Sequence, residues 1–119
     1  MSDSISQGRK DDGGKLRYDL LPLYPLERLA EVYTIGAKKY SDRNWEKGIA
    51  WSRLFAALLR HAFQWARGQQ RDPIDGQHHL ASVAWCALAL MEYEVTHPEL
   101  DDRGRKDLTD VLDGPSNPS

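Results

Sequence analysis

The densest group of polar residues in the sequence is the run Gly-Ala-Lys-Lys-Tyr-Ser-Asp-Arg-Asn-Trp-Glu-Lys-Gly at positions 36–48. Lys38, Lys39 or Arg43 could bind phosphate oxygens, because cationic donors make strong hydrogen bonds to such anions. Asn44 could contact the edge of a base or a sugar, and the ring of Trp45 could stack on a base. A structural explanation is also open, since lysines stabilise a helix C-terminus and a loop tryptophan can close a core. The run is therefore a candidate nucleotide-binding segment.

Glu27 and Glu31 are four residues apart, which places both carboxylates on one face of a helix. Such a pair costs roughly 0.2–0.5 kcal/mol in repulsion unless a cation offsets it. Two carboxylates one turn apart supply the oxygen ligands that Mg²⁺ prefers and shares with substrate phosphates. The pair is therefore either a candidate metal site or a solvated surface on which Arg28 or Lys38 relieves the repulsion.

His61 and His79 fall on two consecutive predicted helices and could meet at the interface of those helices. Asp75 precedes His79 by one helical turn and could orient its imidazole. The group could then act as a general base or a metal ligand, although a helical histidine is also commonly a hydrogen-bonded structural residue. An HD-type phosphohydrolase is disfavoured, because His79 is followed by Leu80 and the sequence contains no His-Asp doublet.

Lys15 and Arg17 follow a Gly-Gly pair near the N-terminus. The segment is not a P-loop, because it lacks the second glycine, the Lys-Ser/Thr end and a preceding strand. Its cations could close over a bound anion. Alternatively, the segment is simply anchored by Tyr18, Leu20 and Leu21.

Three periodic segments must position these residues. Apolar side chains recur at helical spacing from Pro25 to Tyr40, and again from Trp51 or Ser52 to Gly68. A third helix is expected to start at Asp72, or a few residues later, and to end at about Tyr93 or Val95. Since the pattern supports no strand, we predict an all-α fold, a compact bundle of three core helices.

The third predicted helix is almost uniformly apolar from Leu80 to Met91. A helix that is apolar on all sides is expected to be buried on all sides, either within the monomer or against another subunit. Three helices of this length bury too little surface to enclose a central helix. We therefore expect a homodimer or a homotetramer.

The 119 residues suit one domain. We expect a flexible arm over 1–14, an all-α domain over 15–97 and a charged tail over 98–119, in which a short helix could form around Leu108, Val111 and Leu112. The net charge of −2 argues against long nucleic acid as a partner. No apolar run approaches the roughly 20 residues that span a bilayer, so we expect a cytoplasmic protein with no membrane partner. The single cysteine, Cys86, is expected to be buried and inert.

Four motifs occur in order: Lys-Leu-Arg-Tyr-Asp-Leu-Leu-Pro at 15–22, the run at 36–48, Leu-Leu-Arg-His at 58–61 and His-Leu-Ala-Ser-Val-Ala-Trp at 79–85. Together they resemble a phage and prophage family of dATP/dGTP diphosphohydrolases. That family is similar to the all-α, MazG-like nucleoside triphosphate pyrophosphohydrolases, which release pyrophosphate with Mg²⁺ or Mn²⁺. The resemblance implies a phage-encoded protein in the host cytoplasm, or a prophage protein, with this fold and cofactor.

The sequence departs from the MazG-like pattern of Glu-Glu-x-x-Glu on one core helix and Glu-x-x-Asp on the next. The corresponding positions hold other residue types: Arg60, His61 and Gln64 on one helix, and His79 and Ser82 on the next. The usual carboxylate cage is therefore absent. Either the glutamates of the first helix hold the metal, aided by the histidines or by Asp72 and Asp75, or the site binds a nucleotide without hydrolysing it.

The predicted reaction is the attack of a metal-bound water on the α-phosphorus of a purine deoxynucleoside triphosphate, giving the monophosphate and pyrophosphate. Glu27 and Glu31 would hold the metal, and His79 would activate the water with help from His61 and Asp75. The remaining predicted contacts are to phosphates and base, made by Lys15, Arg17, Lys38, Lys39 and Arg60 for the phosphates and by Asn44 and Trp45 for the base. The alternatives are a non-catalytic nucleotide or cyclic-nucleotide binding protein and a helical assembly protein.

Overall fold

The computed structural model of the chain describes residues 7–104. Over this range the chain forms three α-helices, which are α1 (Leu23–Lys39), α2 (Trp51–Ala66) and α3 (His79–Thr96). Short 3₁₀ turns lie in the connections, namely η1 (Tyr18–Leu20), η2 (Asn44–Lys47) and η3 (Pro98–Leu100). Residues 7–104 contain no strand, and one isolated bridge pairs Arg71 with His78. The all-α prediction is confirmed.

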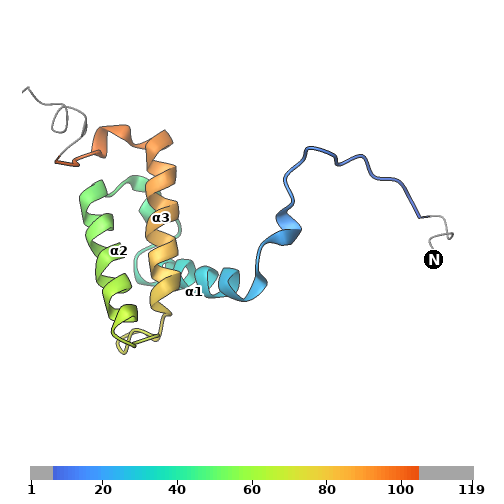
Figure 1. Ribbon diagram of the computed structural model, residues 1–119. Coiled ribbons are helices and arrows are strands. Elements are labelled where there is room, and N and C mark those ends of the chain that lie inside the picture. The colour runs from blue at the N-terminus through green and yellow to red at the C-terminus, as the bar shows by residue number, and fades with distance from the viewer. Residues whose placement is uncertain (1–6, 105–119) are drawn as a thin grey trace, which may run out of the picture.

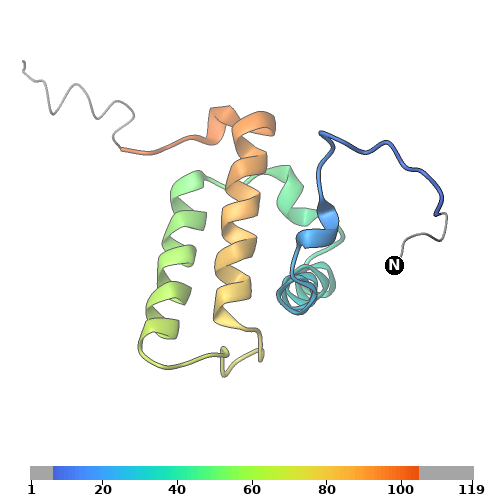
Figure 2. The ribbon, with the colours of Figure 1, turned by 45° about the vertical axis from the view of Figure 1, so that its right-hand side comes forward.

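Helices α2 and α3 form an antiparallel pair that lies side by side in both views (Figures 1 and 2). Helix α1 crosses this pair. In Figure 2 the view runs along the axis of α1, whereas α2 and α3 run up the page. Helix α3 packs against both α1 and α2 and is therefore the central helix of the chain. Figure 1 shows the segment before α1 extending away from the bundle.

The core is small and lies between α2 and α3. It consists of Trp51 and Leu54 from α2 with Ala89 and Tyr93 from α3. Neither Ala89 nor Tyr93 is exposed to solvent, and the small side chain of Ala89 permits close approach of the helices. The Tyr93 hydroxyl donates a hydrogen bond to the carbonyl of Trp45, which ties the η2 turn to the core.

Helix α2 begins at Trp51, one of the two predicted starts. Ala50 occupies the cap position and provides no side-chain hydrogen bond. Instead, the Asp102 carboxylate accepts from the Ser52 backbone N–H at 2.9 Å and from the Ser52 hydroxyl at 2.6 Å. A carboxylate at a helix N-terminus satisfies a free N–H and interacts favourably with the helix dipole. The segment after α3 therefore folds back to cap α2.

Helix α3 begins at His79, so the predicted start at Asp72 is too early. The side chain of Asp72 accepts from the backbone N–H of Ile74 at 2.8 Å, and that of Asp75 accepts from Gln77 at 2.9 Å. Such local hydrogen bonds compete with helix formation and favour turns. Helix α1 in turn begins at Leu23 rather than at the predicted proline, which lies in the first turn, where its missing N–H costs no helical hydrogen bond.

Within this single chain, α3 is not covered on all sides. Leu88, Met91 and Val95 on α3 are 39%, 56% and 81% exposed. The homodimer or homotetramer that would cover them stays a prediction. The short helix expected around Leu108 to Leu112 lies outside the described residues. None of the helices over residues 7–104 is long and apolar enough to cross a membrane.

Candidate functional site

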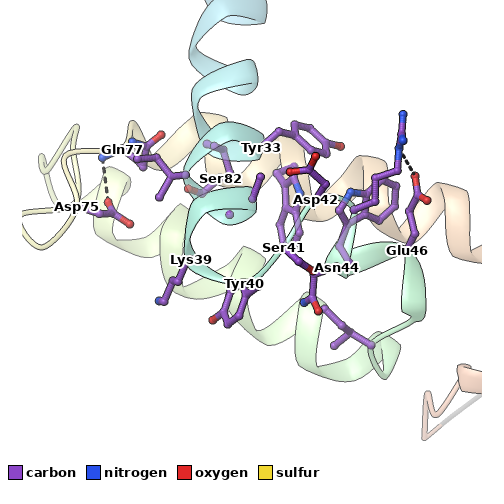
Figure 3. Close-up of a pocket in the computed structure, with 18 of the residues that line it drawn as sticks. Tyr33, Lys39, Tyr40, Ser41, Asp42, Asn44, Glu46, Asp75, Gln77 and Ser82 are labelled. Atoms are coloured by element: carbon purple, nitrogen blue, oxygen red, sulfur yellow. Dashed lines mark hydrogen bonds and ion pairs between the residues drawn. The ribbon is translucent and has the colours of Figure 1, made fainter.

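A cavity of about 680 Å³ lies between α1, the segment that joins α1 to α2, and the start of α3. This volume is within the range of small-molecule binding sites. Part of its wall is aromatic and consists of the side chains of Tyr33, Tyr40, Trp45 and Trp85. Figure 3 shows polar groups at two ends, with Asp75 and Gln77 at one end and Asn44 and Glu46 at the other. The cavity can therefore contact an aromatic ring and charged groups of one ligand.

The aromatic wall is held by ring contacts. Tyr33 meets Trp45 edge-on with a centroid distance of 5.9 Å and meets Trp85 edge-on at 6.4 Å. Trp45 also packs on Tyr93 of the core at 6.2 Å. Trp45 thus closes the core and lines the cavity at the same time, and its stacking on a base stays a prediction.

The polar end near η2 is built by an unusual turn. Arg43 has φ +57°, in the left-handed region, and its guanidinium pairs with Glu46 at 3.5 Å. Asn44 follows it, is half-buried and lines the cavity. Lys39, at the end of α1, also lines the cavity, whereas Lys38 does not. Lys39 and Arg43 are therefore the two cations among the lining residues.

At the opposite end, His61 of α2 meets His79, the first residue of α3. Their Nδ1 atoms are 2.9 Å apart, and the Nε2 atom of His79 is 2.7 Å from the Gln69 side-chain oxygen. With that oxygen as acceptor, His79 Nε2 carries a proton, so in the neutral ring Nδ1 is the acceptor. His61 then donates from Nδ1 and keeps a lone pair on Nε2. The chain of hydrogen bonds sets the tautomer of both rings.

The protonation of His61 follows from its surroundings. Burial lowers the pKa of His61 below its ordinary value, and the neighbouring His79 lowers it further. The carboxylates of Asp72 and Asp75 act in the opposite direction but less strongly. His61 is therefore a neutral imidazole near pH 7 and can accept a proton or bind a ligand.

Asp72 joins the histidines from the loop between α2 and α3. One ligand atom from each of Asp72, His61 and His79 lies within 4.8 Å of the other two. The loop holds Asp72 in place, because its backbone N–H donates to the Gln77 carbonyl at 2.8 Å and its carboxylate accepts from Ile74. This arrangement of two imidazoles and one carboxylate can bind a metal ion or activate a water molecule.

Asp75 lines the cavity but does not hold the His79 ring. Because α3 starts at His79, the helical spacing on which the orienting role was based does not apply. Asp75 accepts from the Gln77 backbone N–H instead, as the dashed line in Figure 3 marks. The ring of His79 is oriented by Gln69. Nothing in the sequence pattern singles out Gln69, because its place depends on the path of the loop.

Glu27 and Glu31 line a second hollow on α1, outside the cavity that His61 lines. Glu31 is 3.2 Å from the guanidinium of Arg28, which relieves the repulsion between the two glutamates. The second hollow shares Ile35 and Gln77 with the cavity, so the two are neighbours. The predicted pairing of these glutamates with the histidines is not present in the described chain.

The remaining predicted cations lie away from the cavity. Lys15 and Arg17 are exposed, and Arg17 pairs with Asp19 through two contacts of 2.8 Å. Arg60 is exposed on α2. None of these three lines the cavity. Their predicted contacts to phosphate stay predictions.

Two polar residues that the sequence analysis did not assign to the site are buried in its wall. Gln77 is 9% exposed and Ser82 is 8% exposed, and both line the cavity. Among the described residues, the side-chain oxygen of Gln77 has no hydrogen-bond partner. A buried acceptor without a partner is costly, so a donor on a bound molecule would stabilise it. The position of Ser82 one turn after His79 was the available signal for that residue.

Comparison with known families gives one assignment. The family model described as dATP/dGTP diphosphohydrolase, N-terminal, matches residues 6–103. No curated protein and no solved structure matches the chain. The family name denotes an enzyme, a diphosphohydrolase, and the match confirms the resemblance carried by the four sequence motifs. The chain belongs to the dATP/dGTP diphosphohydrolase N-terminal family.

Proposed function

We propose that this chain hydrolyses a purine deoxynucleoside triphosphate, of the dATP or dGTP type, to the monophosphate and pyrophosphate. The description of the family, which names dATP and dGTP, supports this choice of substrate class. The observation that carries the proposal is that one cavity combines an aromatic wall with His61 and Asp72, two members of the cluster that His79 completes from behind the wall. A nucleotide has the same two parts, a flat base and a chain of phosphates.

The base would lie at the aromatic wall near Trp45 and Asn44. The rings of Tyr33 and Trp85 add apolar surface there, and aromatic faces and edges both bind flat rings. The Asn44 amide has a donor and an acceptor, which suits the edge of a base or a sugar. Burial raises the pKa of the Tyr33 phenol, so this ring is neutral and offers a hydroxyl donor.

The phosphates would extend from the base toward the histidines. Lys39 and Arg43 line the cavity and can form charge-assisted hydrogen bonds with phosphate oxygens. The exposed Lys15 and Arg17 would contribute only if the segment before α1 moved toward the cavity. The proposal therefore assigns the first phosphate contact to Lys39, because Arg43 lies at the η2 end beside Asn44 and pairs with Glu46.

Hydrolysis at the α-phosphorus needs a group that takes a proton from water and groups that offset the negative charge. His61 suits the first task while no ion is bound to it, because it is neutral near pH 7 and its hydrogen bond to His79 leaves a lone pair on Nε2. The imidazole and carboxylate donors of the cluster also fit a divalent cation, as the resemblance implies. When bound, such a cation would offset phosphate charge and lower the pKa of water.

The proposal is tested by incubating the full chain with each of the four deoxynucleoside triphosphates, in the presence of Mg²⁺ or Mn²⁺, and separating the products. We expect dAMP or dGMP together with pyrophosphate. Replacing His61 by Gln should lower kcat by about 100-fold or more, the usual contribution of a general base. The exposed Glu94 on α3 is the matched control, and Glu94→Gln should leave the rate unchanged.

Two results would contradict the proposal. The absence of monophosphate with every nucleotide and both metals would exclude hydrolysis. Nucleotide that binds and is recovered intact would favour the alternative, a nucleotide-binding protein without catalytic activity.

A further inference from the structure

We propose that His61, Asp72 and His79 form a site for one divalent transition-metal ion of the Mn²⁺, Co²⁺ and Zn²⁺ class. The three side chains come from three different elements, α2, the loop after it and the first residue of α3. One ligand atom from each lies within 4.8 Å of the other two. His79 is 2% exposed, and the other two are half-buried, so the donors meet below the surface.

The spacing of the two imidazoles suits a shared ion. Their Nδ1 atoms are 2.9 Å apart. Two nitrogens bound to one ion at about 2.0–2.1 Å lie about 3.0–3.4 Å apart, depending on the coordination geometry. The two Nδ1 atoms would therefore need to move apart by only a few tenths of an ångström to bind one ion in place of their hydrogen bond.

The tautomer of His79 already suits metal binding. Its Nε2–H donates to the Gln69 side-chain oxygen at 2.7 Å, which leaves the lone pair of Nδ1 directed at His61. Histidine ligands in proteins usually donate their second N–H to a carbonyl or carboxylate in this way. Gln69 is therefore the positioning residue of the site.

His61 must change its tautomer when an ion binds through its Nδ1. The proton that Nδ1 donates to His79 moves through solvent to Nε2 of the same ring, so the neutral pair binds the ion without net proton release. Asp72 supplies the third donor. One of its carboxylate oxygens accepts from Ile74, which leaves the other for the ion.

The donor set indicates the class of metal. Two imidazole nitrogens and one carboxylate oxygen are typical of Mn²⁺, Fe²⁺, Co²⁺ and Zn²⁺ sites, whereas Mg²⁺ and Ca²⁺ prefer oxygen ligands alone. Three protein ligands leave open positions that water or a phosphate oxygen can fill. This site differs in place and in preferred metal from the pair of glutamates on α1. The catalytic use of the ion rests on the proposed function, but its binding does not.

The test uses the full chain, stripped of metal and without nucleotide. Co²⁺ is titrated while its visible absorption is recorded, and Zn²⁺ binding is measured by calorimetry. We expect one ion per chain and new absorption bands from nitrogen ligation. His61→Gln and Asp72→Asn should each weaken binding by at least about 10-fold, and Gln69→Leu should weaken it by about 10–100-fold.

Matched controls keep the result interpretable. His97→Gln removes a histidine outside the cluster, and Glu31→Gln removes a carboxylate of α1; neither should change Co²⁺ affinity. Circular dichroism shows whether each variant is folded, and the half-buried Asp72 and His61 give variants that do not depend on the deeply buried His79.

The proposal fails if the wild-type chain gives no Co²⁺ absorption bands at millimolar concentration, or if His61→Gln and Asp72→Asn bind as tightly as the wild type. Loss of binding in Glu31→Gln alone would place the ion on α1 and would also overturn it. Co²⁺ binding with no hydrolysis of any nucleotide would contradict the proposed function and leave the metal site standing.

Discussion

The Nδ1 atoms of His61 and His79 lie 2.9 Å apart, and this contact joins the middle of α2 to the first residue of α3. The second ring nitrogen of His79 is held by Gln69, which lies in the loop between the two helices. The same hydrogen bonds therefore close the α2–α3 hairpin and orient the groups of the candidate site. A change at His79 should affect stability and chemistry together.

Replacing His79 by Leu should destabilise the chain by about 2–3 kcal/mol, because it leaves His61 and Gln69 without their partner in a buried place. Denaturant unfolding measures this loss. His78 is the control, since its side chain only accepts the Leu80 backbone N–H at the start of α3. His78→Ala should cost about 1 kcal/mol, the usual contribution of a helix cap. Equal losses for the two variants would show that the His61–His79 contact adds nothing.

The three helices could be predicted because α1 and α2 each have a long apolar stripe and α3 is a long, almost uniformly apolar run. Their boundaries were less certain where side chains bind the backbone, as Asp72 and Asp75 do just before α3. The meeting of His61 and His79 was predictable as a possibility, since the two residues fall on consecutive helices. The role of Gln69 was not, because loop residues have no periodic pattern that indicates their direction.

The predicted metal site on α1 shows a second limit. The spacing of Glu27 and Glu31 places both on one face of α1, but a sequence does not define how that helix crosses α2 and α3. In the structure the crossing brings them to a hollow beside the cavity and pairs Glu31 with Arg28. The distance from Glu27 and Glu31 to the histidines thus depends on the tertiary structure, and the local sequence pattern does not predict it.

The pKa values of His61 and His97 should depart from the ordinary histidine value in opposite directions. Burial lowers that of His61, whereas the hydrogen bond to the Glu99 carboxylate, with help from the Glu46 carbonyl, raises that of His97. Titration of the imidazole resonances by NMR should therefore show His97 losing its proton at a higher pH than His61. The opposite order would contradict the contacts described for both rings.

The raised pKa of His97 has a consequence for stability. The interaction with Glu99 stabilises the folded chain fully below the ordinary histidine value, and this contribution is lost as the pH rises through the folded pKa. The difference in melting temperature between the wild type and His97→Gln should thus be larger at about pH 6 than at about pH 9. Comparing the two proteins at each pH cancels the opposite effect of His61.

Cys86 should not react with thiol reagents while the chain is folded. Its side chain is 1% exposed, and burial raises the pKa of the thiol to about 11, so the reactive thiolate is scarce near pH 8. A chromogenic disulfide reagent should release no coloured thiolate from the folded chain at pH 8. After the chain is unfolded in urea, it should release one equivalent per chain. Rapid labelling of the native chain would show that α3 opens at this position.

Two glycines should respond in opposite ways to an added methyl group. Gly48 has φ +105°, and a Cβ there would lie 2.6 Å from the Leu100 side chain and 3.2 Å from His97. Gly48→Ala should therefore destabilise the chain by about 1–3 kcal/mol, from backbone strain and from displacement of the segment that caps α2.

Gly36 is the matched control, because it lies within α1 and an added Cβ would meet no atom within 4 Å. Alanine is favoured over glycine in a helix by roughly 0.5–1 kcal/mol, so Gly36→Ala should raise the free energy of unfolding. Gly36 also lines the cavity, and its methyl group would occupy space there. If the cavity binds a nucleotide, Gly36→Ala should be more stable than the wild type and yet bind more weakly, which chemical unfolding and calorimetry on one preparation can measure. Equal affinity with higher stability would place the nucleotide away from this wall of α1.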